Sequence, residues 1–273
     1  MEHEGQIEVV ISDYILTPLS CSSLISEIVK CLIYQKCQIP YSYNWLKSAI
    51  NRRRRQEKEA ENEDNLSKRN INFTVENHFR TASKLYDDVE EAMKELGGEL
   101  TRSIVSEVVI LFGPTPICPK EVCTIRLPKL AYGHFEESHV KDALKHQHKA
   151  LRQVFLSNIW MDTVDSAIPC TNTYIFIKKD DASHTKHFKP CDPLRFQMSV
   201  KQYSINLTWE CSKESLCCKN LTVFCEKSQS HIRQNEVELS VLPTDKQMWY
   251  QFEYSIKGFK NVYVNKSAAC DLW

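Results

Sequence analysis

Apolar residues recur every three or four positions in some stretches of the chain and alternate, or form short continuous runs, in others. The helical spacing predicts three long helices, over residues 21–38, 73–96 and 139–162. Ser22 or Ser23 can cap the first helix, and Gly97-Gly98 follows the second. Strand-like runs lie at residues 6–17, 106–113, 121–127, 171–179, 195–200, 204–211, 236–242 and 248–259.

Helices dominate the first half of the chain and strands the second, which predicts a single α+β domain over residues 1–273. The helices would pack on a mostly antiparallel β-sheet, with a hairpin turning at Lys201-Gln202. A helical domain followed by a β domain is the alternative. The strands near residues 7 and 107 favour one domain, because each needs partners from the second half.

Residues 51–70 contain one aliphatic side chain, Leu66, and blocks of both charge signs. This composition predicts a solvated, charged flexible loop rather than a nuclear localisation signal. Over the whole chain Lys+Arg and Asp+Glu both number 35, so no net charge favours nucleic acid or an acidic membrane. No apolar run approaches the ~20 residues that span a bilayer. We therefore predict neither nucleic-acid nor membrane binding.

Twelve cysteines and five Asn-x-Ser/Thr sequons are typical of secretion, but the N-terminus has no basic n-region or apolar h-region. We expect a cytosolic or nuclear protein with reduced thiols. No Cys-x-x-Cys pair occurs, so we predict no metal and no cofactor. A thiol or zinc protein is the weaker alternative, built on the one cluster of cysteines: Cys211, Cys217, Cys218 and Cys225.

No motif supports catalysis. The chain has six glycines and no glycine-rich phosphate loop, and it contains neither Gly-x-Ser-x-Gly nor His-Glu-x-x-His. Many pairings of a cysteine nucleophile with a histidine base are possible, and the sequence does not place such side chains in space. We therefore predict an interaction protein rather than an enzyme.

The end of the first predicted helix leaves one polar position open to two interpretations. Gln35 falls within the apolar arc of this helix, whereas Tyr34 falls on its polar side. A buried amide needs hydrogen-bond partners. Water or a loop could supply them at a frayed helix end, or the backbone of a partner protein could.

The third predicted helix has one clear core-facing stripe, but its C-terminal half is apolar almost all round. Such a helix is either buried on both sides or has a docking patch on its second face. Aromatic anchors are common at interface centres. The side chains in question are Phe155, Leu156, Ile159 and Trp160.

Four blocks of the sequence, in order, resemble the comet family of spindle-checkpoint proteins, which bind the checkpoint protein Mad-two. The similarity runs from about Cys21 to Asn261 and is weak or absent at residues 52–70 and 226–246. The blocks are IVKCLIYQKCQIPYSYNWLK (28–47), VVILFGPTPICPKE (108–121), ALRQVFLSNIW (150–160) and WYQFEYSIKGFKN (249–261).

The resemblance implies a HORMA-like fold, with three long helices on a sheet and a C-terminal safety-belt-like segment at about residues 212–261. It also implies a heterodimer with closed Mad-two through the third long helix. In the family, the residues matching Gln35 and Phe155 are key contacts. The implied surface includes Tyr34, Arg152 and Ile159.

The resemblance further implies an adaptor that antagonises the mitotic checkpoint complex and presents Mad-two to a Pch-two-type AAA+ ATPase, which returns it to the open form. The ATPase contact matches Phe188, Lys189 and Pro190, with Cys191 where the family has lysine. The implied location is the nucleus and cytoplasm, with spindle or kinetochore binding in mitosis. The alternative is another HORMA-type scaffold that captures closure peptides, as meiotic axis proteins do.

Overall fold

The structure is a computed structural model that describes residues 4–12, 14–62, 72–131, 140–164, 166–180, 186–197, 199–210 and 247–273. Its main sheet has the strand order β1-β6-β3-β2-β4-β7-β5, with β8 beside β4. The strands are β1 (Glu4–Ser12), β2 (Val105–Gly113), β3 (Glu121–Arg126), β4 (Asn172–Lys179), β5 (Phe188–Cys191), β6 (Lys201–Glu210), β7 (Met248–Phe252) and β8 (Ile256–Lys257).

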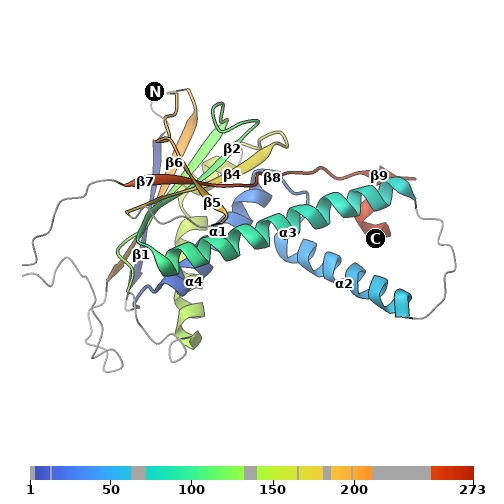
Figure 1. Cartoon of the computed structure of the whole chain (residues 1–273), viewed down its shortest axis with the longest axis horizontal. Helices are drawn as coiled ribbons and strands as arrows, with labels where there is room; N and C mark the ends of the chain where they lie inside the picture. Colours follow the sequence, from blue (N-terminus) through green and yellow to red (C-terminus); the bar gives the residue numbers. More distant parts are fainter. Residues whose placement is uncertain are drawn as a thin grey trace, which may run out of the picture.

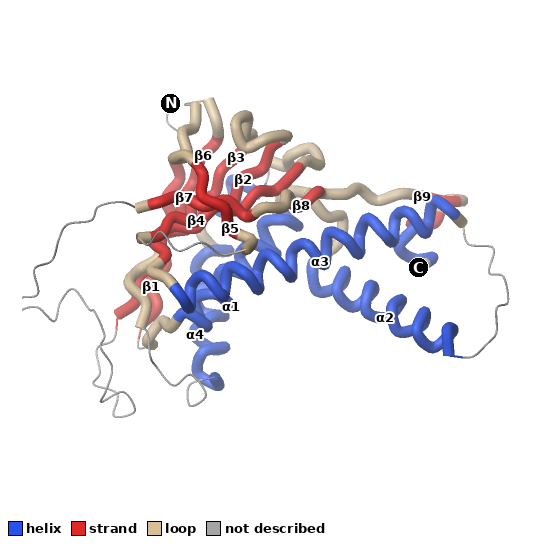
Figure 2. The backbone as a smooth tube through the Cα atoms, in the orientation of Figure 1, coloured by secondary structure: helices blue, strands red, loops and turns tan. Residues whose placement is uncertain are grey.

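The helices gather on one side of this sheet (Figure 2). α3 extends far beyond the sheet, and α2 runs beside α3. The C-terminus lies against these two helices (Figure 1). The helices are α1 (Pro18–Gln35), α2 (Tyr43–Asn62), α3 (Phe73–Arg102), α4 (Val140–Phe155) and α5 (Asn158–Val164). The chain closes with β9 (Tyr263–Val264), β10 (Ser267–Ala268) and the 3-10 helix η4 (Ala269–Leu272).

The sheet is mostly antiparallel, which confirms the predicted fold class. Only β6 runs parallel to its neighbours, β1 on one side and β3 on the other. The remaining pairs in the sheet are antiparallel. The predicted need of β1 and β2 for partners from the second half is confirmed, because β1 pairs with β6 and β2 with β4.

The predicted hairpin at Lys201-Gln202 is wrong, because β6 begins at Lys201 and runs through both residues. The described residues of 195–200 form no strand. Instead, Phe196 and Val200 pack against the face of the sheet that lies opposite the helices. The apolar residues of this run therefore belong to a segment that covers one face of the sheet, not to a strand.

Strand β2 shows why its sequence is a continuous apolar run. Val108, Ile110 and Phe112 belong to the main core, which the helices cover. Val109 and Leu111 point the other way, into a smaller cluster beneath the 192–200 segment. Because successive side chains alternate between faces, a strand buried on both sides has no polar alternation.

The ends of the first two predicted helices differ from the prediction, and the first ends at Gln35 rather than at Gln38. α1 begins earlier, because Thr17 caps it by accepting a hydrogen bond from the Ser20 backbone N–H, and Pro18 suits the first helical position. α3 does not stop at Gly97-Gly98 but continues to Arg102. A methyl group at Gly97 would lie 2.7 Å from Ser22 Oγ, so this glycine allows α1 and α3 to pack closely.

The predicted charged loop at residues 51–70 is wrong for residues 51–62, which complete α2 and add a fourth long helix. The helix is held by ion pairs to α3, because Arg53 reaches Glu76 at 3.3 Å and Arg54 reaches Asp87 at 2.6 Å. Residues 63–70 lie outside the described part. So does most of the predicted belt at about 212–261, of which the described residues form β7, β8 and the start of the tail.

The C-terminal tail leaves the sheet after β8 and packs on α3, and its last residue, Trp273, lies against Trp45 of α2. His78 of α3 donates a hydrogen bond from Nε2 to the Lys260 carbonyl oxygen at 3.2 Å, and its ring packs against Phe259 and Trp273. Burial lowers the pKa of His78, which favours its neutral form. The tail is therefore part of the folded domain.

Candidate functional site

The candidate site begins where α1 ends. Lys36 caps the helix, and its backbone N–H donates to the Leu32 carbonyl oxygen. Cys37 then takes a left-handed backbone conformation with φ 55°. This reversal turns the chain away from the helix axis and leaves Tyr34 and Gln35 on the last turn.

Gln38, which the sequence analysis did not single out, joins three segments beside this turn. Its Nε2 donates to the Lys36 carbonyl oxygen at 2.6 Å, and its Oε1 accepts from the Thr171 backbone N–H at 2.7 Å. Its own carbonyl oxygen accepts from the Phe259 N–H at 2.9 Å. A methyl group at Gly258 would lie 2.9 Å from that oxygen, so the Lys-Gly-Phe sequence needs glycine here.

These three segments enclose a surface groove of about 750 Å³, called the α1-end groove below. Its lining is mostly apolar, with Gln35 and two polar tail residues among the exceptions. The lining residues are Tyr34, Gln35, Cys37, Ile39, Pro40, Ala167, Ile168, Pro169, Cys170, Phe259, Lys260 and Asn261.

Tyr34 and Gln35 are both accessible in this groove. Tyr34 is 45% exposed. Gln35 is half-buried, and no hydrogen bond joins its side-chain amide to another described residue. The interpretation that a loop within the chain satisfies this amide is therefore not supported by the described residues, while water and a partner protein remain as hydrogen-bond partners.

A buried ion pair attaches the C-terminal end of α1 to the sheet. Lys36 Nζ lies 2.5 Å from Glu121 Oε1 at the start of β3, and both side chains are almost fully buried. Burial lowers the pKa of Lys36, and the Glu121 carboxylate opposes this shift. The pair fixes α1 to the sheet next to the Tyr34–Gln35 turn. No signal in the sequence marked Lys36 as buried, because charged residues at helix ends are normally solvated.

The predicted third long helix is two helices, because the chain breaks at Ser157. Ser157 Oγ donates to the Val154 carbonyl oxygen at 2.8 Å and accepts from the Trp160 backbone N–H at 3.1 Å. Leu144, Arg152 and Leu156 are exposed. Among the described residues no carboxylate pairs with Arg152. The surface of α4 and the turn that follows it therefore offers apolar and cationic groups to a partner.

Phe155 and Ile159 are less accessible than a docking patch alone would predict. Phe155 is half-buried, and its ring centroid lies 5.1 Å from that of Trp160, which is buried. Ile159 is half-buried over Gly5 of β1, where a methyl group would lie 2.5 Å from Ile159 Cγ2. Each of these two side chains packs on the core with one side, and the docking patch on the other side stays a prediction.

Gln153 fixes α4 to the edge of the sheet. Its Oε1 accepts from the Val10 backbone N–H at 3.0 Å, and its Nε2 donates to the Val10 carbonyl oxygen at 2.9 Å. The amide therefore pairs with β1 as a neighbouring strand would. This occupies part of the strand edge and sets the position of the helix that carries Arg152 and Phe155.

Gln153→Ala is expected to loosen this attachment. Loss of two hydrogen bonds to an exposed strand edge should lower the free energy of unfolding by about 1–2 kcal/mol and speed amide hydrogen exchange at Val10. Exchange measured by NMR or mass spectrometry checks this. Gln56→Ala on the exposed face of α2 is the control. Unchanged protection of Val10 would show that Gln153 does not hold the edge.

The predicted ATPase contact lies elsewhere, on the edge strand β5 at the opposite end of the sheet from β1. Phe188 is 0% exposed and packs against Phe252, so its side chain is not available to a partner, and that part of the prediction is wrong. Lys189 and Pro190 are exposed, and Lys189 pairs with Glu253 at 3.1 Å. These two residues stay a prediction.

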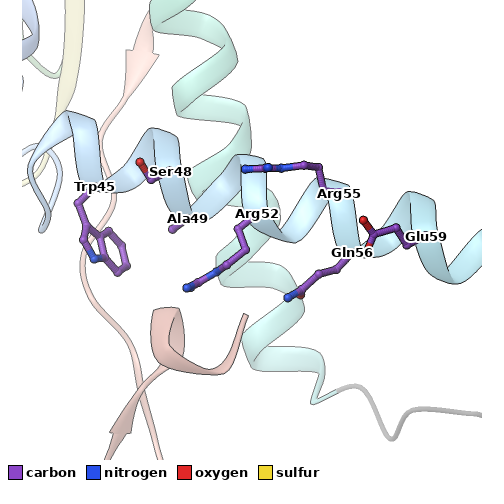
Figure 3. Close-up of a pocket in the computed structure, with 7 residues that line it drawn as sticks. All are labelled: Trp45, Ser48, Ala49, Arg52, Arg55, Gln56 and Glu59. Atoms are coloured by element: carbon purple, nitrogen blue, oxygen red, sulfur yellow. The ribbon is translucent and has the colours of Figure 1, made fainter.

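A second hollow lies on the outer face of α2, where Trp45, Arg52, Arg55 and Glu59 follow one another along the helix (Figure 3). The four-arginine run is thus divided: Arg53 and its neighbour Arg54 face α3, whereas the other two face solvent. A carboxylate beside two exposed guanidinium groups is ordinary for a solvated helix face.

Within the described ranges, no helix is both long and apolar enough to cross a membrane. Over the same residues, no group of three or more His, Cys, Asp or Glu side chains is placed to hold a metal ion. The cysteines at 211–225, on which the zinc alternative depends, lie outside the described part of the chain.

Most of the chain matches one family of known proteins. A family model described as p31comet, with binding of Mad1 and Cdc20-bound Mad2 (Mad-two), matches residues 3–225. The chain belongs to the p31comet family. This confirms the resemblance found in the sequence and agrees with the mixed α+β fold.

Two curated members of the p31comet family are similar at low identity. The MAD2L1-binding protein of Homo sapiens is 22% identical over 196 residues, which cover 72% of this chain and 67% of that protein. The MAD2L1-binding protein of Mus musculus is 20% identical over 240 residues, covering 88% and 74%. At this identity the residue-level contacts must be tested on this chain.

Proposed function

We propose that this p31comet-family chain is a non-enzymatic adaptor that binds the closed conformer of Mad-two. The surface of α4, the start of α5 and the last turn of α1 would form the interface. Arg152 and Phe155 lie on α4, Ile159 on α5, and Tyr34 and Gln35 on α1. The observation that carries the proposal is the Gln35 side-chain amide, which lies at an accessible helix end and has no hydrogen-bond partner among the described residues. Membership of a Mad-two-binding family supports it.

Size-exclusion chromatography of the purified chain with Mad-two tests this proposal. Mad-two locked in the closed form and Mad-two locked in the open form are run separately. We expect co-elution with the closed form alone, because the proposed interface recognises the closed conformation of Mad-two. Co-elution with neither form would reject the proposal, and equal co-elution with both would reject conformer selectivity.

We propose further that the adaptor antagonises the mitotic checkpoint complex and presents Mad-two to a Pch-two-type AAA+ ATPase, which silences the spindle checkpoint. The family resemblance supports this role, and so do the exposed Lys189 and Pro190 on β5, distant in the sheet from α4. The nucleus and cytoplasm, and the spindle or kinetochore in mitosis, are the matching locations. ATP-dependent conversion of closed Mad-two, measured with and without the chain, tests the role.

A further inference from the structure

The α1-end groove reaches well beyond the two residues of the proposed interface that line it. Its floor and walls come from Ile39, Ile168 and Phe259, which are buried in the isolated chain. Pro40 and Pro169 add apolar surface, and neither has a backbone N–H to offer. The groove is therefore shaped for an apolar side chain rather than for a hydrogen-bonded strand.

The walls are held in place before any partner arrives. Gln38 binds the 36–40 turn to Thr171 on one side and to Phe259 on the other. Tyr41 OH adds a short hydrogen bond to Asn261 Oδ1. A pre-formed pocket costs little ordering entropy on binding, which favours its use as a binding site.

One end of the groove is cationic. Lys260 is exposed, and among the described residues no carboxylate forms an ion pair with its ammonium group. His78 donates a hydrogen bond to the Lys260 carbonyl oxygen, which fixes the position of the Lys260 backbone. Burial raises the pKa of the Cys170 thiol on the opposite wall, and the Lys260 charge opposes that shift, so the charge lies near the groove.

We propose that the α1-end groove is part of the Mad-two interface and takes an apolar side chain of Mad-two that lies beside a carboxylate. The inference rests on the proposed function and deepens it. Continuity supports the occupant, because Tyr34 and Gln35 belong both to the groove and to the proposed interface. Charge complementarity supports the carboxylate, because Lys260 lies at the edge of the apolar surface and has no carboxylate partner among the described residues.

Thiol footprinting of the complex tests whether the groove is covered. Cys37 lines the groove and is exposed, whereas Cys118 is exposed in the connection between β2 and β3. Both are alkylated with iodoacetamide, alone and with closed Mad-two, and the rates are followed peptide by peptide. We expect the Cys37 rate to fall at least about tenfold in the complex and the Cys118 rate to stay within about twofold, because alkylation needs access.

A charge reversal tests the carboxylate. Lys260→Glu should weaken binding of closed Mad-two about five- to twentyfold at low salt, with a smaller effect at high salt, because screening reduces the interaction. Lys266→Glu makes the same change in the β9–β10 turn of the same tail, outside the groove, and should change the affinity less than about twofold. Calorimetry at two salt concentrations measures both.

The outcomes separate this inference from the proposed function. Protection of Cys37 together with the Lys260→Glu effect supports the whole assignment. If a complex forms but Cys37 reacts as fast as in the free chain, the proposed function stands and the assignment of the α1-end groove to the interface is wrong. If Cys37 is protected but Lys260→Glu and Lys266→Glu bind closed Mad-two with equal affinity, the proposed contact between Lys260 and a carboxylate is wrong. Absence of any complex overturns the proposed function and the occupant together.

Discussion

The combined variant Gln35→Ala/Phe155→Ala is expected to lose co-elution with closed Mad-two altogether. Each side chain, as a central contact, should contribute at least about 2 kcal/mol to binding, which corresponds to about thirtyfold in Kd. Together they would weaken the complex by roughly a thousandfold if their effects add. Chromatography at micromolar concentrations would then show no complex, and calorimetry of the single variants would give the two contributions.

The two substitutions should differ in their effect on stability. Gln35→Ala removes an amide without partners in the described residues and should change the free energy of unfolding by less than about 0.5 kcal/mol. Phe155→Ala should cost about 1–3 kcal/mol, less than for a fully buried ring, because the ring packs against Trp160 but is only partly buried. The folded variant must therefore be verified by circular dichroism before binding is measured.

Matched controls are available on surfaces remote from α4. Phe73→Ala removes an aromatic ring that is 81% exposed at the start of α3, and Gln56→Ala removes an exposed amide from α2. Both should bind closed Mad-two as the unchanged chain does. Full binding by Gln35→Ala/Phe155→Ala, or equal loss with the controls, would show that the interface lies elsewhere.

Lys179→Met is expected to give a large loss of stability without a specific loss of binding. Lys179 Nζ lies 2.9 Å from Glu99 Oε2, with the two side chains 0% and 1% exposed, and 4.4 Å from the centroid of the Tyr250 ring. Removing the lysine leaves the carboxylate in the core without its main partner, which costs about 3–5 kcal/mol. The thermal midpoint should fall by roughly 6–15 °C.

Lys178→Met is the matched control, one residue along the same strand. Its ammonium group pairs with Glu107 at 3.1 Å, with both side chains 24% exposed, so its loss should cost no more than about 1 kcal/mol. The paired replacement Glu99→Leu/Lys179→Met should recover much of the loss, because no unpaired buried charge remains and Arg102, the second cation at Glu99, is 55% exposed. Equal midpoints for the two single lysine variants would contradict the assignment of Lys179–Glu99 as a buried tie between α3 and β4.

The fold class could be predicted from the sequence because the apolar spacing reports burial directly. β2 and β4 are buried on both faces, and their runs were continuous for that reason. The course of α3 through Gly97-Gly98 could not be predicted, because glycine there serves contact with Ser22 of α1 rather than a helix end. Residues 51–62 were mistaken for a loop because α2 is stabilised by pairs with α3, which the local sequence does not contain.

The candidate site was only partly predictable. The helical wheel marked Gln35 as unusual, and the structure places it in a groove. The groove itself depends on Gln38 and Gly258, more than 200 residues apart in the sequence, whose contact no periodicity reveals. Phe188 was assigned to a surface contact but its side chain is buried, because a motif match carries no information on which way a strand side chain faces.

The parallel pairing of β1 with β6 has a consequence for synthesis of the chain. Residues 4–12 pair with residues 202–210, so β1 has no sheet neighbour until β6 has left the ribosome. Such long-range pairing makes folding slow and leaves an unpaired strand exposed meanwhile. α4 emerges earlier, and through Gln153 it can shield one edge of β1 but not the edge that β6 takes. A nascent chain stalled before residue 200 would therefore carry an open strand edge, the kind of surface that cotranslational chaperones protect.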